Sequence, residues 1–114
     1  MIEISTAAVQ EYLDQHKNKP MYIHLETTNG AYASHMGGSR NVGVFIRNIE
    51  IKYSTGKITG NGPFRIGIKL EQGWAYGEGL SHYIINDKGQ LLLAGHDEDG
   101  RLAVAFELSP IPYV

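Results

Sequence analysis

Short runs in which apolar and polar residues alternate, separated by turn-forming residues, fill most of the chain after residue 20. The clearest of these runs are residues 21–28 and 64–70. Alternation places successive side chains on opposite faces of a strand, so each run predicts a β-strand with one buried face. Many of the 14 glycines lie at the boundaries of these runs, where tight hairpin turns need them. The pattern predicts a mainly β fold, a small antiparallel barrel-like or folded sheet.

One helix is predicted near the start of the chain. Apolar or small side chains recur at i, i+3, i+4 and i+7 from Val9 to His16, which is the spacing of a narrow helical stripe. Ser5 or Thr6 can cap its first N–H groups, and Pro20 ends it. We therefore expect one N-terminal helix over about residues 6–18 within a single domain of residues 1–114.

Composition narrows the classes of partner and compartment. The chain has no cysteine, which excludes disulfides, thiolate metal sites and cysteine nucleophiles. Ten basic and twelve acidic residues nearly balance, so no nucleic-acid partner is expected. No apolar run approaches the roughly 20 residues of a membrane span, and residues 1–5 do not resemble a signal peptide. A cytoplasmic protein without a membrane partner is expected.

The apolar phase changes inside the segment 42–53. Val42, Val44 and Ile46 share one face, whereas Ile49 and Ile51 follow the opposite phase. A shift of one residue near 47–48 predicts a β-bulge, or a strand that bends from one sheet to another.

A candidate metal site follows from the Asn29-Gly30 pair, which is typical of a two-residue type I′ hairpin turn. With that turn, Thr28 faces Ala31 and His24 faces His35. Glu26 then lies on the same face as both histidines. Two imidazoles and a carboxylate at this spacing could bind a divalent first-row metal. The alternative is that His24, Glu26 and His35 form the solvated face of an ordinary hairpin.

A candidate ligand site is predicted at Trp74, Tyr76 and Glu78. If residues 71–73 form a three-residue loop, Leu70 faces Trp74 and every large apolar side chain of the hairpin falls on one side. Glu78 would then be buried beside the two aromatic rings, which disfavours its charged form and marks it as a functional candidate. The alternatives are a structural pairing of Glu78 with Arg65, Lys69 or a tyrosine hydroxyl, or a place at the open end of the barrel.

Two further histidines receive a structural interpretation. His82 and His96 are expected to share an apolar face near Ala94 as hydrogen-bonded core residues. Ser81 lies in no recognisable nucleophile motif.

Several segments, in order along the chain, resemble the YojF-like family, a domain of unknown function found in Gram-positive bacteria. They are 22–33 (YIHLETTNGAYA), 45–48 (FIRN), 60–65 (GNGPFR), 73–76 (GWAY), 78–80 (EGL), 94–97 (AGHD) and 102–105 (LAVA). The resemblance implies a β-rich, barrel-like and oligomeric protein, with no established activity or catalytic residues to carry over. It also implies an accessory role, because the family is associated with gene neighbourhoods containing a zinc-dependent deacetylase of low-molecular-weight thiol synthesis.

Two functional hypotheses follow, with a third beside them. The first is a non-catalytic small-molecule-binding or accessory protein, a homo-oligomer with a pocket near Trp74, Tyr76 and Glu78 and no cofactor. The second is a metal-dependent, cupin-like enzyme that holds a divalent metal with His24, Glu26 and His35, although the cupin motif itself is absent. The third is a structural subunit that stabilises a partner enzyme, for which the family resemblance implies the thiol-synthesis deacetylase.

Overall fold

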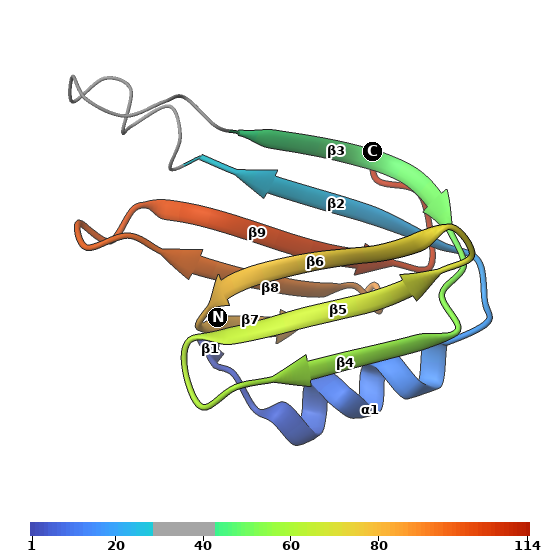
Figure 1. The fold of residues 1–114 in the computed structure, drawn as a ribbon, viewed down its shortest axis with the longest axis horizontal. Helices are drawn as coiled ribbons and strands as arrows, with labels where there is room; N and C mark the ends of the chain where they lie inside the picture. Colours follow the sequence, from blue (N-terminus) through green and yellow to red (C-terminus); the bar gives the residue numbers. More distant parts are fainter. Residues whose placement is uncertain (29–42) are drawn as a thin grey trace.

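Two antiparallel β-sheets and one helix make up the part of the chain that the computed structural model describes, residues 1–28 and 43–114 (Figure 1). The mainly β prediction is confirmed. In these residues the two sheets do not close on each other, so the structure is a folded pair of sheets rather than a closed barrel. The elements in chain order are β1 (Ile2–Glu3), α1 (Thr6–His16), β2 (Met21–Thr27), β3 (Val44–Ile51), β4 (Thr55–Thr59), β5 (Phe64–Leu70), β6 (Gly73–Leu80), β7 (His82–Ile85), β8 (Leu91–His96) and β9 (Leu102–Ser109).

The larger sheet has the strand order β1-β7-β8-β9-β2-β3, and the smaller one the order β4-β5-β6. Figure 1 shows the three-stranded sheet lying over one face of the six-stranded sheet, with α1 running beneath β4. β6 makes the direct contact between the sheets, against β8 and β9. The chain leaves β6 at Leu80 and enters the larger sheet at β7, where the backbone N–H of Ser81 donates to the carbonyl of Ala94 at 2.9 Å.

The predicted helix is confirmed, with observed bounds Thr6–His16. Ser5 is its N-cap, and the Ser5 hydroxyl accepts a hydrogen bond from the backbone N–H of Ala8 at 3.2 Å. The buried stripe consists of Val9, Tyr12 and Leu13. No helix among the described residues is long and apolar enough to cross a bilayer.

The predicted bulge in β3 is also confirmed. The pairing of β2 with β3 shifts by one residue between Ile23 and His24, and Asn48 adopts a left-handed φ of 63°. The extra residue lets Ile46 and Ile49 lie on the same side of the sheet although they are three positions apart.

The hydrophobic core fills the space between the two sheets and α1. Glycines permit the closest approach of the sheets. A Cβ atom on Gly77 would lie 3.0 Å from the Phe106 ring, and one on Gly95 would lie 1.9 Å from the carbonyl oxygen of Gly79. The core residues are Val9, Tyr12, Leu13, Met21, Ile23, Tyr53, Ile58, Ile66, Ile68, Leu80, Leu91, Leu93, Val104, Phe106 and Leu108.

Candidate functional site

The β5–β6 hairpin has a different register from the predicted one. Leu70 pairs with Gly73 and Lys69 pairs with Trp74, so the loop consists of two residues and the predicted three-residue loop is wrong. The reason lies in the opposite sheet. The Phe106 ring occupies the space beneath β6, and only the small side of β6, which includes Gly77, fits above it.

Consequently Trp74 and Tyr76 point away from the core and are 46% and 43% exposed. Their rings are stacked, with centroids 5.7 Å apart and planes inclined by 8°. The Arg65 guanidinium carbon lies 4.3 Å from the centre of the Tyr76 ring, and the Lys69 ammonium lies 5.8 Å from that of Trp74. The outer face of the small sheet therefore carries two stacked aromatic rings with a cation against each of them.

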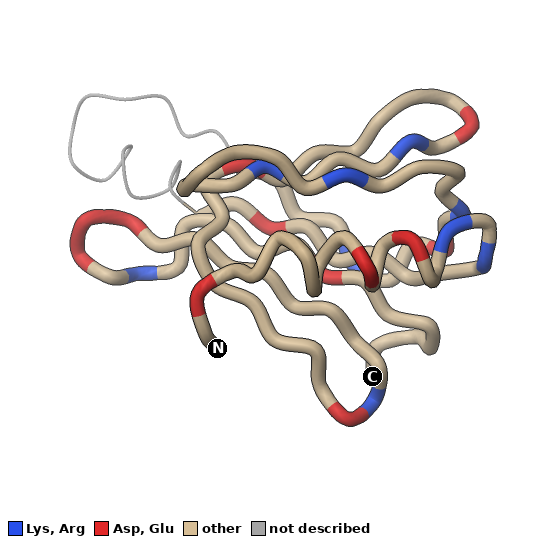
Figure 2. The backbone as a smooth tube through the Cα atoms, turned by 90° about the horizontal axis from the view of Figure 1, so that it is seen from below, with Lys and Arg blue, Asp and Glu red and all other residues tan. Residues whose placement is uncertain are grey.

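Glu78 is exposed, and the prediction that it is buried is wrong. Its carboxylate Oε1 lies 2.9 Å from Nε of Arg65, as in the alternative interpretation of a structural ion pair. Both side chains are more than half exposed, so the pair is weak and open to exchange with other ions. Figure 2 shows Lys and Arg positions along the three-stranded sheet at the top of the view, whereas acidic positions lie mainly in turns and on the helix.

A groove of about 600 Å³ runs between β6 and the ends of β2, β3 and β9. Tyr76 and Glu78 line this groove, together with Arg65, but Trp74 does not. Two of the three predicted ligand residues therefore line a hollow. The prediction rested on a three-residue loop and a buried Glu78, and the structure has neither. The lining residues are Leu25, Thr27, Val44, Arg65, Tyr76, Gly77, Glu78, Gly79, His96, Ala103 and Val104.

The groove combines an apolar floor with a charged rim. Leu25, Val44 and Val104 supply apolar surface, and Arg65 and Glu78 supply an ion pair at the rim. No local pattern in the sequence marks Val104 or Leu25 for this role, because they belong to strands that are distant along the chain.

His24 lies on the other face of the six-stranded sheet and is 5% exposed. Its Nε2 is 3.1 Å from Oε1 of Glu26, and its Nδ1 is 3.2 Å from Nη1 of Arg47. Arginine is only a donor, so Nδ1 accepts from Arg47 and Nε2–H donates to Glu26 in the neutral tautomer that fits these contacts. His24 and Glu26 do share a face and are in contact, as the alternation predicted.

The predicted pairing of His24 with His35 is wrong. In the two ladders of β2, His24 lies opposite Arg47 on β3 and opposite Glu107 on β9. The physical reason is that β2 is an inner strand with both edges already paired. His35 and the Asn29-Gly30 pair lie outside the described residues. Within residues 1–28 and 43–114, no three His, Asp or Glu side chains are arranged to hold a metal ion.

Glu107 and Tyr113 complete the polar cluster around His24. Burial raises the pKa of Glu107, while the neighbouring His24 and Arg47 oppose that shift. Asn48 holds Tyr113 by two hydrogen bonds to its backbone, of 2.8 and 2.7 Å. The Tyr113 hydroxyl is buried and has no hydrogen-bond partner in the described part of the chain. Sequence reasoning missed both residues, since only the strand order brings them to His24.

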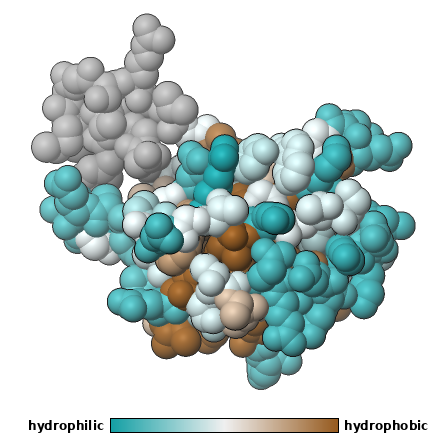
Figure 3. Space-filling model, turned by 60° about the horizontal axis from the view of Figure 1, so that its bottom comes forward, coloured by the Kyte–Doolittle hydropathy of each residue, from teal (hydrophilic) through white to brown (hydrophobic). Residues whose placement is uncertain are grey.

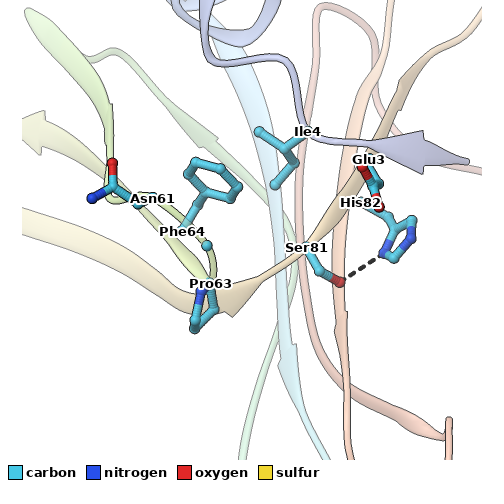
Figure 4. A pocket seen from close by; sticks show the side chains of 8 residues that line it. Glu3, Ile4, Asn61, Pro63, Phe64, Ser81 and His82 are labelled. Carbon is cyan, nitrogen blue, oxygen red and sulfur yellow. Dashed lines mark hydrogen bonds between the residues drawn. The ribbon is translucent and has the colours of Figure 1, made fainter.

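A second hollow, of about 450 Å³, lies where the chain passes from β6 to β7 (Figure 4). Ile4 and Phe64 line it, and the Ser81 hydroxyl lies 2.7 Å from Nδ1 of His82 beside them. The ring centroids of His82 and His96 are 5.6 Å apart, so these histidines do lie on a common side as predicted. His96 is exposed, however, and the prediction that it is a core residue is wrong.

A family model, a curated relative and a solved structure all indicate the same family for this chain. A family model described as "Protein of unknown function (DUF1806)" matches residues 3–113. The "Uncharacterized protein YojF" of Bacillus subtilis (strain 168) is 43% identical over 106 residues, which cover 92% of this chain and 91% of the relative. The crystal structure of the Bacillus subtilis YojF protein superimposes with a TM-score of 0.82 at 40% identity, covering 98% of this chain and 95% of that one.

Proposed function

The chain belongs to the DUF1806 family, whose function is unknown, and from the geometry of its own residues we propose that it is a binding protein for a small amphipathic anion. The proposed site is the groove between β6 and the ends of β2, β3 and β9. The observation that carries the proposal is the combination, in one hollow of about 600 Å³, of an apolar floor and the exposed Arg65–Glu78 pair.

The apolar floor favours a ligand with a hydrocarbon or aromatic body. Leu25, Val44 and Val104 come from three different strands and converge on the groove, so a body placed there removes apolar surface from water on several sides. Each square ångström buried in this way stabilises the complex by roughly 25 cal/mol before the cost of association is subtracted.

The rim favours a negatively charged end group. The guanidinium of Arg65 is planar and matches a carboxylate or phosphate in two-point contact. Its present partner, Glu78, is an exposed carboxylate of the same chain. An exposed ion pair contributes only about 0–1 kcal/mol, so a ligand carboxylate can replace Glu78 at little cost.

Titration of the labelled protein with phenylacetate and octanoate, followed by amide chemical shifts, tests the proposal. We expect shifts at Gly77, Gly79 and Val104, and smaller ones with phenylethylamine, which has the opposite charge. Arg65→Gln should weaken binding about tenfold, which corresponds to about 1.4 kcal/mol.

The matched control is Lys57→Gln. Lys57 is an exposed cation on β4 of the same sheet, opposite Gly67, and it does not line the groove. It should leave the affinity unchanged. Shifts that map outside the groove, or an equal loss of affinity in both variants, would contradict the proposal.

A further inference from the structure

The strand β3 forms one margin of the six-stranded sheet. It pairs with β2 on one side, and in residues 1–28 and 43–114 no strand pairs with its other side (Figure 1). A margin of eight residues exposes a row of backbone N–H and C=O groups that can accept a further strand.

Three large apolar side chains of β3 are exposed. Phe45 is 70% exposed, Ile49 52% and Val44 41%. Of the features that protect single edge strands, β3 has two charged residues and the bulge at Asn48, but it is eight residues long and contains no lysine or proline. Its length and apolar character therefore favour a covered edge.

The opposite margin of the sheet differs. Its edge strand, β1, has only two residues. Exposed apolar residues do gather there, where Ile2, Ile84 and Ile85 line a hollow of about 330 Å³. Figure 3 shows hydrophobic residues grouped in the lower part of the visible face. That margin offers little backbone for pairing, so a substitution there serves as the control in the experiment below.

We propose that β3 pairs antiparallel with β3 of a second copy of this chain, joining two six-stranded sheets into one. The charges of β3 select the register. A twofold axis between Asn48 and Ile49 places Arg47 of each copy opposite Glu50 of the other and Ile46 opposite Ile51. Both charged side chains are exposed, although within its own chain Arg47 contacts His24 and the Tyr113 ring and Glu50 accepts a hydrogen bond from the Tyr22 hydroxyl. The cross-copy pairs would therefore share these groups with their partners in the same chain. Opposite charges across neighbouring strands stabilise the pairing, whereas like charges oppose it.

The bulge is compatible with this arrangement. Because the phase changes at Asn48, Arg47 and Glu50 both lie on the outer face of the sheet, beside His24 and Tyr22 of β2. Ile46 and Ile51 both lie on the core side, beside Leu25 and Met21. Each proposed cross-copy pair therefore joins residues on the same face. In a twofold pairing each cross-copy contact occurs twice, so the stabilisation of the dimer by one residue pair is doubled.

Sedimentation velocity of the full chain tests the proposal. The wild type should sediment as twice the 12.6 kDa chain. Ile49→Lys should lower the dimer association constant at least about tenfold, since it places two like charges beside the axis. Ile85→Lys introduces the same charge at a side chain of 41% exposure on β7 and should leave the dimer intact. A monomeric wild type would mean that something else covers β3, and a dimer lost only in Ile85→Lys would assign the interface to the other margin. Either result overturns the proposal.

A charge exchange tests the register separately. Arg47→Glu and Glu50→Arg should each be monomeric alone, because each places like charges opposite one another twice. Mixed in equal amounts, they should form a heterodimer, since both cross-copy pairs are then complementary. Circular dichroism of each variant checks that it is folded. Homodimers of the single variants, or a mixture of two folded variants that remains monomeric, would overturn the register.

Discussion

The replacement Gly95→Ala tests how the two sheets are packed. A Cβ atom on Gly95 would lie 1.9 Å from the carbonyl oxygen of Gly79 and 2.8 Å from its carbonyl carbon. Both atoms belong to the backbone, so no side-chain rotation can relieve the contact. The strands β6 and β8 would have to move apart by about 1.5 Å to restore an ordinary contact of roughly 3.4 Å.

The expected cost is large because the movement involves the core. Inserting one methyl group into a packed interior costs typically about 1–3 kcal/mol. Here the opposing atom is backbone, next to a junction fixed by the hydrogen bond from Ser81 N–H to the Ala94 carbonyl, so we expect the upper end, about 3 kcal/mol. For a chain of 114 residues this corresponds to a fall in Tm of about 12 °C.

Urea unfolding followed by circular dichroism measures the change in the free energy of unfolding. The control is Gly43→Ala, because a Cβ atom there would meet only the carbonyl oxygen of Thr27 at 3.5 Å, an ordinary contact. The control should change stability by less than about 0.5 kcal/mol. If Gly95→Ala costs less than about 1 kcal/mol with an unchanged m-value, the close approach of Gly79 and Gly95 does not constrain the sheets and the reasoning is refuted.

Four further predictions follow from individual contacts. Gly67→Ala places a Cβ atom 2.7 Å from the Tyr76 ring, which is a side chain that can swing aside; we expect little loss of stability but weaker phenylacetate binding in the shift titration. Burial raises the pKa of Glu107 in the folded state, so its contribution to stability is present below the unfolded pKa and is lost as pH rises through the folded pKa. Glu107→Gln should therefore raise Tm at neutral pH, with the gain vanishing in acid; a gain that persists at low pH would contradict this. Tyr113→Phe removes a buried hydroxyl without a partner in the described residues and should raise the free energy of unfolding or leave it unchanged, as urea titration would show. Ser5→Ala removes the helix cap and should cost about 1 kcal/mol, with Thr6→Ala as the control.

Several features were predictable from the sequence because their causes are local. The cap at Ser5 and the stripe through Val9 and Leu13 specify α1 within about one turn of the chain. The phase change near Asn48 predicted the bulge, because each apolar residue must return to the core side of its own strand.

The candidate site was predicted only in part, because its residues meet through strand order. His24 and Glu26 are two positions apart on one strand, and their contact follows from alternation. Arg47 and Glu107 flank His24 only because β2 lies between β3 and β9, which no turn motif in the sequence specifies. The sequence prediction placed Tyr76 on the wrong face of β6. It assumed that large apolar residues are buried, and it could not take into account the space that the opposite sheet leaves beneath β6.

The sequence by itself determined the strands at 21–28 and 64–70, where the helix begins and where β3 changes phase, since backbone conformation and side-chain period act over a few residues. Only the tertiary structure decided which strands are neighbours and which face of β6 is buried. There the Phe106 ring fills the space beneath Gly77, so the aromatic side of the strand is turned outward and Tyr76 and Arg65 come to line a groove. Packing of this kind depends on volumes contributed by residues far apart in the chain, and no local pattern contains them.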